Sequence, residues 1–179
     1  MKDYQITESK TMFSGKIVSV EHDTITLPNG RPAMRENVRH AGGAAVLPVD
    51  NDGNMVFVRQ YRHSVREMML EIPAGTLNAE ETHEECAIRE LEEEVGYKAG
   101  NIRFLARINP SPGYCSESIY IYLATRLVKG RQNLDEEEFI EIETYTPDEA
   151  VQMIFDGRIT DGKTVMAILA YRELDPGGC

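Results

Sequence analysis

Residues 73–97 read PAGTLNAEETHEECAIRELEEEVGY, and the second half of this stretch is typical of a single helix. Thr82 fits the N-cap, and Glu85, three residues later, fits the acidic position of a capping box. Gly96 fits the C′ position at which helices commonly end. Four apolar residues recur at helical spacing between these ends and predict a stripe that faces the core: Ala87, Ile88, Leu91 and Val95.

Three glutamates of this helix, Glu90, Glu93 and Glu94, stand at i, i+3 and i+4, so their carboxylates share one face. The placement is unfavourable because like charges repel and because the last turns of a helix favour cations. We expect Arg89 alone to offset little of this repulsion. Hard oxygen ligands on one face suit Mg²⁺ or Mn²⁺. The charge pattern by itself is more typical of a solvated acidic face on a surface helix.

The residues around the glutamates form a fixed frame, G-x5-E-x7-R-E-U-x-E-E-x-G-U, in which U is a bulky aliphatic residue. The matching residues are Gly75, Glu81, Arg89, Glu90, Leu91, Glu93, Glu94 and Gly96, and Tyr97 stands at the final U. This frame resembles the box of Nudix hydrolases. The resemblance implies a loop–helix–loop that holds Mg²⁺ against a diphosphate, with Glu90, Glu93 and Glu94 as ligands. In the family, the carbonyl of Ala74 often joins them, and Arg89 and Glu81 mainly support the loop.

The composition is that of an acidic globular protein. The chain has 179 residues, 41% of them hydrophobic, which suits one domain with a small appendage. Its net charge of −11 and pI near 4.8 argue against non-specific binding to nucleic acid or to a membrane surface. The first ten residues lack the apolar core of a signal peptide, and no apolar run approaches a membrane span. Cys86, Cys115 and Cys179 are odd in number and lack zinc spacing, so we expect free thiols in a reducing cytoplasm.

Residues 12–40 predict a small β unit. MFSGKIVSVEH and DTITL are strand-like, and LPNGRPA has turn chemistry. The unit is too small to be stable alone, so it must pack on the rest of the chain or on a partner. We therefore divide the chain into an N-terminal β subdomain, residues 1–40, and a hydrolase domain, residues 41–179. In related enzymes the first segment crosses to a second subunit, which implies dimerisation and adenine contacts here.

Strands and helices are interspersed after residue 40. One helix is expected to begin with Pro147 at N1, and another at Thr160 or Asp161. This pattern predicts a layered α/β fold. The family resemblance narrows the prediction to the Nudix α/β/α sandwich with a mixed sheet.

A proline- and glycine-containing loop follows the box. Pro112, Gly113 and Glu117 lie about as far beyond it as a comparable proline does in ADP-ribose pyrophosphatases, so the resemblance implies that they contact substrate. Without the box, the same residues would be read as an ordinary hairpin loop, because proline and glycine are common in turns.

Two further segments resemble substrate contacts of this subfamily. Arg35 and Glu36 match the adenine-contacting segment of its dimeric members, where a guanidinium can stack on the base. Arg62 matches an arginine that approaches the diphosphate, and its planar fork suits phosphate oxygens. Taken singly, each could equally be a surface residue of an edge strand.

The acidic run at residues 135–138 is the candidate source of the catalytic base. Such runs are often merely solvated. A water that attacks a diphosphate nevertheless needs a proton acceptor, and carboxylates that bind metal make poor ones. In the ADP-ribose subfamily an acidic loop at this place supplies it. The comparison favours Glu136, and it leaves Glu137 and Glu138 open.

The sequence thus predicts a cytoplasmic, homodimeric, Mg²⁺-dependent Nudix pyrophosphatase that hydrolyses ADP-ribose to AMP and ribose 5-phosphate, with Mn²⁺ as a substitute metal. One alternative is hydrolysis of another nucleotide sugar or nucleoside diphosphate derivative. A second is a non-catalytic, nucleotide-binding regulator with the same fold, against which the intact glutamates argue. No nucleic-acid or membrane partner is expected.

Overall fold

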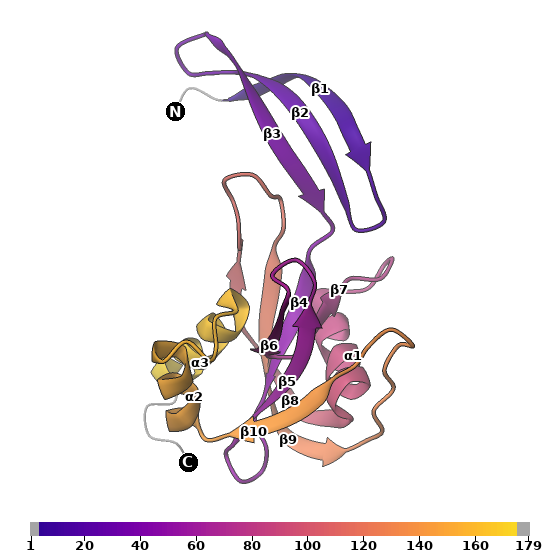
Figure 1. Ribbon diagram of the computed structural model, residues 1–179, viewed down its shortest axis with the longest axis vertical. Helices are drawn as coiled ribbons and strands as arrows, with labels where there is room; N and C mark the ends of the chain where they lie inside the picture. Colours follow the sequence, from indigo (N-terminus) through magenta and orange to yellow (C-terminus); the bar gives the residue numbers. More distant parts are fainter. Residues whose placement is uncertain (1–3, 175–179) are drawn as a thin grey trace. The chain divides into compact units, whose positions relative to one another are not determined.

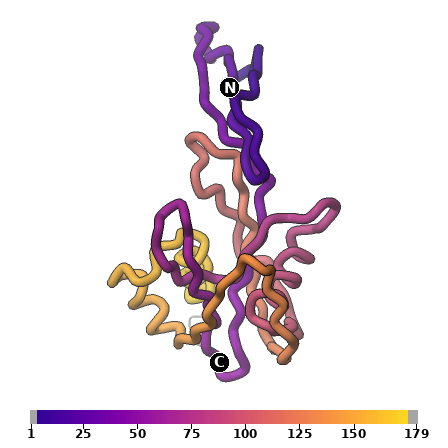
Figure 2. Tube along the Cα trace, turned by 45° about the vertical axis from the view of Figure 1, so that its right-hand side comes forward, coloured from indigo at the N-terminus to yellow at the C-terminus, as the bar shows by residue number. Residues whose placement is uncertain are grey.

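The computed structural model describes residues 4–174, and they form two compact units (Figure 1). The first comprises the described residues up to Gly42 together with Asn109–Ser118. The second comprises Gly43–Ile108 and the described residues from Ile119 onward. The chain therefore passes between the units after residues 42, 108 and 118, a path that can be followed along the tube in Figure 2.

The first unit is an antiparallel sheet of β1 (Gln5–Ser14), β2 (Val18–Thr26) and β3 (Pro32–His40), in that order. The first strand begins at Gln5, ahead of the expected start at residue 12. The stretch MFSGKIVSVEH is not one strand, because the amide of Gly15 donates to the carbonyl of Val18 and turns the chain between β1 and β2. Every residue of β1 is exposed in the single chain.

The loop Asn109–Ser118 completes this unit. The amide of Val38 donates to the carbonyl of Tyr114 at 2.7 Å, and the amide of Ser116 donates to the carbonyl of Val38 at 2.9 Å. These bonds attach the loop to β3 although it comes much later in the chain.

The second unit contains two sheets with helices on both sides (Figure 1). In the first sheet, β7 (Ala74–Thr76), β4 (Gly43–Pro48), β9 (Ile119–Lys129) and β8 (Tyr97–Ile108) follow one another, and only the β4–β9 pair is parallel. The second is antiparallel, with the order β10 (Glu141–Tyr145), β5 (Met55–Arg62), β6 (Glu67–Glu71). Helix α1 (His83–Val95) covers one side, and α2 (Pro147–Phe155) and α3 (Gly162–Leu174) cover the other. The predicted α/β/α sandwich with a mixed sheet is confirmed.

Strand β4 shows why the central strands are apolar throughout. Ala44 and Val46 pack on the α1 side, whereas Ala45 and Leu47 pack on the side of α2 and α3. Side chains alternate across a strand, so a strand buried on both faces needs apolar residues at every position.

The ends of the helices lie where capping chemistry places them. Thr82 caps α1 in a capping box with Glu85, and Gly96 adopts φ 70° at its other end. Pro147 begins α2 as expected. The buried stripe of α1 was predicted wrongly at one position, because Ile88 is 39% exposed. Cys86 is buried in the core, as expected for a small residue on this helix. Among the described residues, no helix combines the length and apolarity needed to cross a bilayer. Cys86 and Cys115 are free thiols, and Cys179 lies outside the described residues.

Candidate active site

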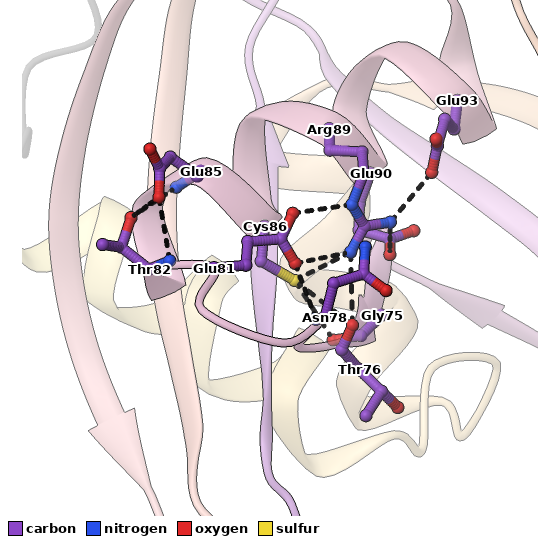
Figure 3. A network of polar contacts seen from close by, with 10 residues as sticks. All are labelled: Gly75, Thr76, Asn78, Glu81, Thr82, Glu85, Cys86, Arg89, Glu90 and Glu93. Atoms are coloured by element: carbon purple, nitrogen blue, oxygen red, sulfur yellow. Dashed lines mark hydrogen bonds and ion pairs between the residues drawn. The ribbon is translucent and has the colours of Figure 1, made fainter.

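Arg89 holds the loop that leads into α1 (Figure 3). Its Nε donates to Glu81 Oε1 at 2.7 Å and its Nη2 to Glu81 Oε2 at 3.0 Å, a side-on pairing with two bonds. Nη2 also donates to the carbonyl of Thr76, and Glu81 accepts from the amide of Asn78. The hydrogen bond from Arg89 lowers the pKa of Glu81 to about 2. The loop between β7 and α1 is therefore fixed by one ion pair and its backbone contacts.

The same guanidinium also bonds the helix carboxylates. Arg89 Nη1 lies 2.5 Å from Glu90 Oε1 and 2.9 Å from Glu93 Oε2 (Figure 3). The fork of Arg89 thus reaches Glu81, Glu90 and Glu93 together. The i, i+4 spacing indicates the contact with Glu93, whereas the contact with Glu81 spans the turn before the helix. How far these contacts offset the repulsion stays a prediction.

Gly75 allows Glu90 to lie against the backbone of the loop. A Cβ on Gly75 would stand 1.7 Å from Glu90 Oε1, well inside any permitted contact. Glu90 is buried, and burial is the main cause that raises the pKa of its carboxyl. The absence of a side chain at residue 75 thus creates the space that this carboxylate fills.

Glu94 is the most deeply buried carboxylate of the helix, with 3% of the residue exposed. It accepts a hydrogen bond from the amide of Ala74 at 3.2 Å. Burial, followed by the charges of Glu90 and Glu138, raises the pKa of Glu94 to about 8. A buried carboxylate in such surroundings favours either a proton or an added cation.

The donor set fits a hard divalent cation in its chemistry. Glu90, Glu93 and Glu94 offer carboxylate oxygens, and the carbonyl of Ala74 lies next to the amide that bonds Glu94. The three glutamates do not converge as they stand. Within residues 4–174 no three acidic, thiol or imidazole side chains form a metal-binding group, and Glu90 and Glu93 bond Arg89 instead. Binding of a metal at all three would require these two carboxylates to turn toward the ion, either away from Arg89 or through the oxygen that each does not give to Arg89.

The loop that carries the acidic run at residues 135–138 is hydrogen-bonded to the end of α1. The amide of Asn133 donates to the carbonyl of Glu93 at 3.0 Å, and the side chain of Gln132 donates to the carbonyl of Glu94 at 2.7 Å. Within this loop, Glu138 is the residue whose charge contributes to the raised pKa of both Glu90 and Glu94. The favoured Glu136 is exposed, and so is Glu137, whereas Glu138 is half-buried.

A pocket of about 620 Å³ opens beside the cluster, on the outer side of α1. Arg89 and Glu93 contribute to its wall, so it is continuous with the candidate site. The lining residues are Glu85, Ile88, Arg89, Glu92, Glu93, Arg131 and Asn133.

Arg62 belongs to a second charged cluster in the same unit. Its Nε and Nη2 each donate to the buried Glu71 at 2.7 Å. Lys163 Nζ lies 2.5 Å from Glu71 Oε2 and 3.1 Å from Asp161 Oδ2. Glu71 is the main cause that raises the pKa of Arg62, and Glu94 contributes to the rise, which links this cluster to the carboxylates of α1. Glu71 and Lys163 belong to no motif of the sequence and were not predicted as site residues. An acid within the apolar run LEIPAG was the available signal for Glu71.

The remaining predicted residues lie in the first unit. Arg35 Nη1 donates to the carbonyl of Met34 at 2.8 Å, and Glu36 pairs with His22 at 3.7 Å. Glu117 pairs with His40 at 3.6 Å, in the loop that also carries Pro112 and Gly113, both exposed. The residues expected to contact adenine and those of the loop Asn109–Ser118 thus lie in the first unit. The glutamates of α1, Arg62 and the acidic loop at residues 135–138 lie in the second.

Residues 39–168 match a family model described as NUDIX domain. The match covers more than half of the chain, so the chain belongs to the Nudix family. The resemblance expected from the frame around the helix glutamates is confirmed.

Individual relatives extend over nearly the whole chain. An ADP-ribose pyrophosphatase of Bacillus subtilis is 37% identical over 159 residues, which cover 88% of this chain and 86% of that protein. A methanol dehydrogenase activator of Bacillus methanolicus is 41% identical over 163 residues, or 90% of this chain and 88% of the relative. A crystal structure described as an ADP compounds hydrolase is similar with a TM-score of 0.88 at 25% identity, covering 99% of this chain and 96% of that one.

Proposed function

We propose that this Nudix protein is an enzyme that hydrolyses the diphosphate of ADP-ribose and releases AMP and ribose 5-phosphate. The observation that carries the proposal is the pair of buried carboxylates, Glu90 and Glu94, set against the loop at Ala74 and Gly75. A purely nucleotide-binding module would gain nothing from burying them, since each costs stability without a cation. The name of the Bacillus subtilis relative and the solved ADP compounds hydrolase support the substrate class.

The reaction would depend on Mg²⁺, with Mn²⁺ as a substitute. Glu90, Glu93, Glu94 and the Ala74 carbonyl would hold the ion. When bound, the metal supplies charge neutralisation at the diphosphate and an acidified water. The water oxygen forms a bond to one phosphorus, and the bridging P–O bond breaks so that the bridging oxygen leaves with the other phosphate. Arg62 would offer its guanidinium to the phosphate oxygens, and Arg89 would keep the loop in place.

The proton lost by the attacking water would go to a carboxylate of residues 135–138. Resemblance to the subfamily favours Glu136. The half-burial of Glu138 and its influence on Glu90 and Glu94 favour Glu138 instead. Both positions are therefore candidates, and single substitutions separate them.

Substrate recognition and assembly would involve the first unit. Arg35 and Glu36 would contact adenine, and Pro112, Gly113 and Glu117 would border the substrate. A homodimer is supported by apolar residues that β1 leaves exposed in the single chain: Ile6, Met12 and Phe13. We expect a C2 dimer in the cytoplasm, where Cys86 and Cys115 would stay reduced. A monomer in light scattering at micromolar concentration, with full activity, would contradict the dimer.

The test is a coupled phosphatase assay over nucleoside diphosphate derivatives, nucleoside triphosphates, dinucleoside polyphosphates and NADH, with and without Mg²⁺. ADP-ribose should give the highest kcat/KM, and omission of metal should abolish turnover. The Glu93→Gln variant, purified in parallel, controls for contaminating hydrolases. A higher kcat/KM for a triphosphate would reject the substrate, and equal activity in the variant would reject the site.

A second candidate function is activation of a dehydrogenase, because one relative of 41% identity bears that name. The two functions can be separated with the Glu93→Gln variant. If activation of a methanol dehydrogenase is retained when hydrolysis is lost, the chain is a regulator in its own right. If both are lost together, activation depends on the hydrolysis.

A further inference from the structure

Four charged side chains of the second unit form a network outside α1: Arg62, Glu71, Asp161 and Lys163. Glu71 is 1% exposed and receives two bonds from Arg62 and one from Lys163. Lys163 is 8% exposed and also contacts Asp161. Two acids and two bases balance within the network. Each Glu71 oxygen therefore has a cationic partner.

The position of Lys163 is costly. It lies in the first turn of α3, where the helix dipole disfavours cations, and its ammonium is removed from water. A buried ion pair of this kind is weak evidence for a stabilising role, because apolar replacements are often as stable. The link between β6 and α3 does not need it, since the amide of Ile72 already donates to Thr164 Oγ1 at 2.9 Å.

The pairing of Arg62 with Glu71 determines how the guanidinium is presented. Nε and Nη2 are both directed at Glu71. Within the described part of the chain, Nη1 has no hydrogen-bond partner, and the side chain is 39% exposed. Because the guanidinium is planar, fixing two nitrogens fixes the direction of the third.

We infer that Lys163 is a positioning residue for the hydrolysis: by holding Glu71 it fixes the plane of Arg62, so that Nη1 meets the diphosphate of the substrate. The inference rests on the proposed function, since it assigns Arg62 a phosphate to bind. Lys163 itself is buried and contacts Glu71 and Asp161, so no direct contact with the substrate is assigned to it. Its effect on the reaction passes through Glu71 to Arg62 alone.

A double-mutant cycle tests this route. Lys163→Met removes the ammonium and keeps an apolar stem of similar length, and it is made in the wild-type and in the Arg62→Met background. With Arg62 present, Lys163→Met should lower kcat/KM for ADP-ribose about tenfold. With Arg62 replaced, the same change should matter less than about twofold, because the group it positions is already gone. The concentration of Mg²⁺ that gives half-maximal activity should not move.

Two measurements separate positioning from folding. All assays are made well below the lowest Tm of the set, and Thr164→Val serves as the matched control. That variant removes both hydrogen bonds of the Thr164 hydroxyl, to the amide of Ile72 and to Asp161, but leaves Lys163, Glu71 and Arg62 unchanged. It should lower Tm while kcat/KM stays near the wild-type value. Calorimetric binding of ADP-ribose to the chelator-treated protein gives a readout without turnover, and it should weaken with Lys163→Met.

The outcomes are distinct. Equal losses of kcat/KM in both backgrounds, or no loss beside an intact Arg62, would overturn the inference. If Lys163→Met does not fold, Glu71→Gln enters the same cycle and must show the same dependence on Arg62. If the wild-type protein does not hydrolyse ADP-ribose, the proposed function fails, and the calorimetric arm still decides whether Lys163 acts on diphosphate binding.

Discussion

Replacing Glu94 by glutamine should stabilise the metal-free protein. The glutamine keeps the size of the side chain and an oxygen that can accept from the amide of Ala74. It removes an ionisable group that is almost wholly buried and that lies near the charges of Glu90 and Glu138. The substitution therefore removes the cost of holding this carboxyl, charged or protonated, in such surroundings, and little else.

The magnitude follows from proton linkage. The pKa of Glu94 rises from its ordinary 4.5 to about 8 in the folded protein, so between these values the folded state keeps a proton that the unfolded state has released. Stability then falls as the pH rises through this window and levels off above it. At pH 7 the interval is about 2.5 pH units, and at about 1.4 kcal/mol per unit the penalty is about 3 kcal/mol. For a chain of this length that is about 6–12 °C in Tm.

The assay is thermal unfolding in chelator between pH 5 and pH 9, for wild type, Glu94→Gln and the control Glu92→Gln. Glu92 lies on the same helix and pairs with Lys98 at 3.1 Å, on the surface. Its replacement should change stability by less than about 0.5 kcal/mol. The advantage of Glu94→Gln should be small near pH 5 and grow toward pH 8, and added Mg²⁺ should raise Tm for wild type more than for the variant. A Glu94→Gln variant less stable than wild type at pH 8 in chelator would refute the reasoning.

Three further results are expected. Gly75→Ala should lower kcat/KM at least about 100-fold, because the added Cβ occupies the place of the Glu90 carboxylate. The control Gly162→Ala has open space around the new methyl group and should leave the activity unchanged. Equal activities of the two variants would show that Glu90 does not need the space at residue 75. Each carboxylate of the acidic loop is replaced in turn, as Glu136→Gln, Glu137→Gln and Glu138→Gln. The variant that lacks the catalytic base should show kcat lowered about 10²–10⁴-fold at nearly constant KM, and uniformly small effects would place the base elsewhere. Thr82→Ala and Thr146→Ala each break a capping box and should each cost about 1 kcal/mol, read as a fall of about 2–4 °C in Tm; unchanged melting would contradict the capping geometry.

The sequence could predict the parts of the fold that depend on local chemistry. Both ends of α1 could be predicted because Thr82 and Gly96 cap backbone groups within one turn of the helix. The α/β/α arrangement came from the family resemblance, since periodicity predicts elements but not their layers. The start of β1 at Gln5 was missed because that strand is exposed throughout and carries no alternation.

The candidate site was predictable only where its members are neighbours in the chain. Glu90, Glu93 and Glu94 follow from helix geometry, but the reach of Arg89 back to Glu81 depends on how the loop folds. Lys163 and Glu71 are brought together because α3 packs near the end of β6. No local pattern in the sequence predicts such a pair. The position of Glu138 relative to Glu90 and Glu94 likewise depends on backbone bonds between the loop and the end of α1.

The attachment of the loop Asn109–Ser118 to β3 has a consequence for synthesis on the ribosome. The bonds of Val38 to Tyr114 and Ser116 cannot form until those residues have left the exit tunnel. At about 5–20 residues per second, the roughly 77 residues that separate Val38 from Cys115 take about 4–15 s to translate. During that interval the first three strands emerge with the loop-binding edge of β3 unpaired. Nascent chains stalled after β3 has left the tunnel but before residue 109 is added should therefore bind chaperones through this edge, and chains stalled after Ser118 has emerged should bind them less there.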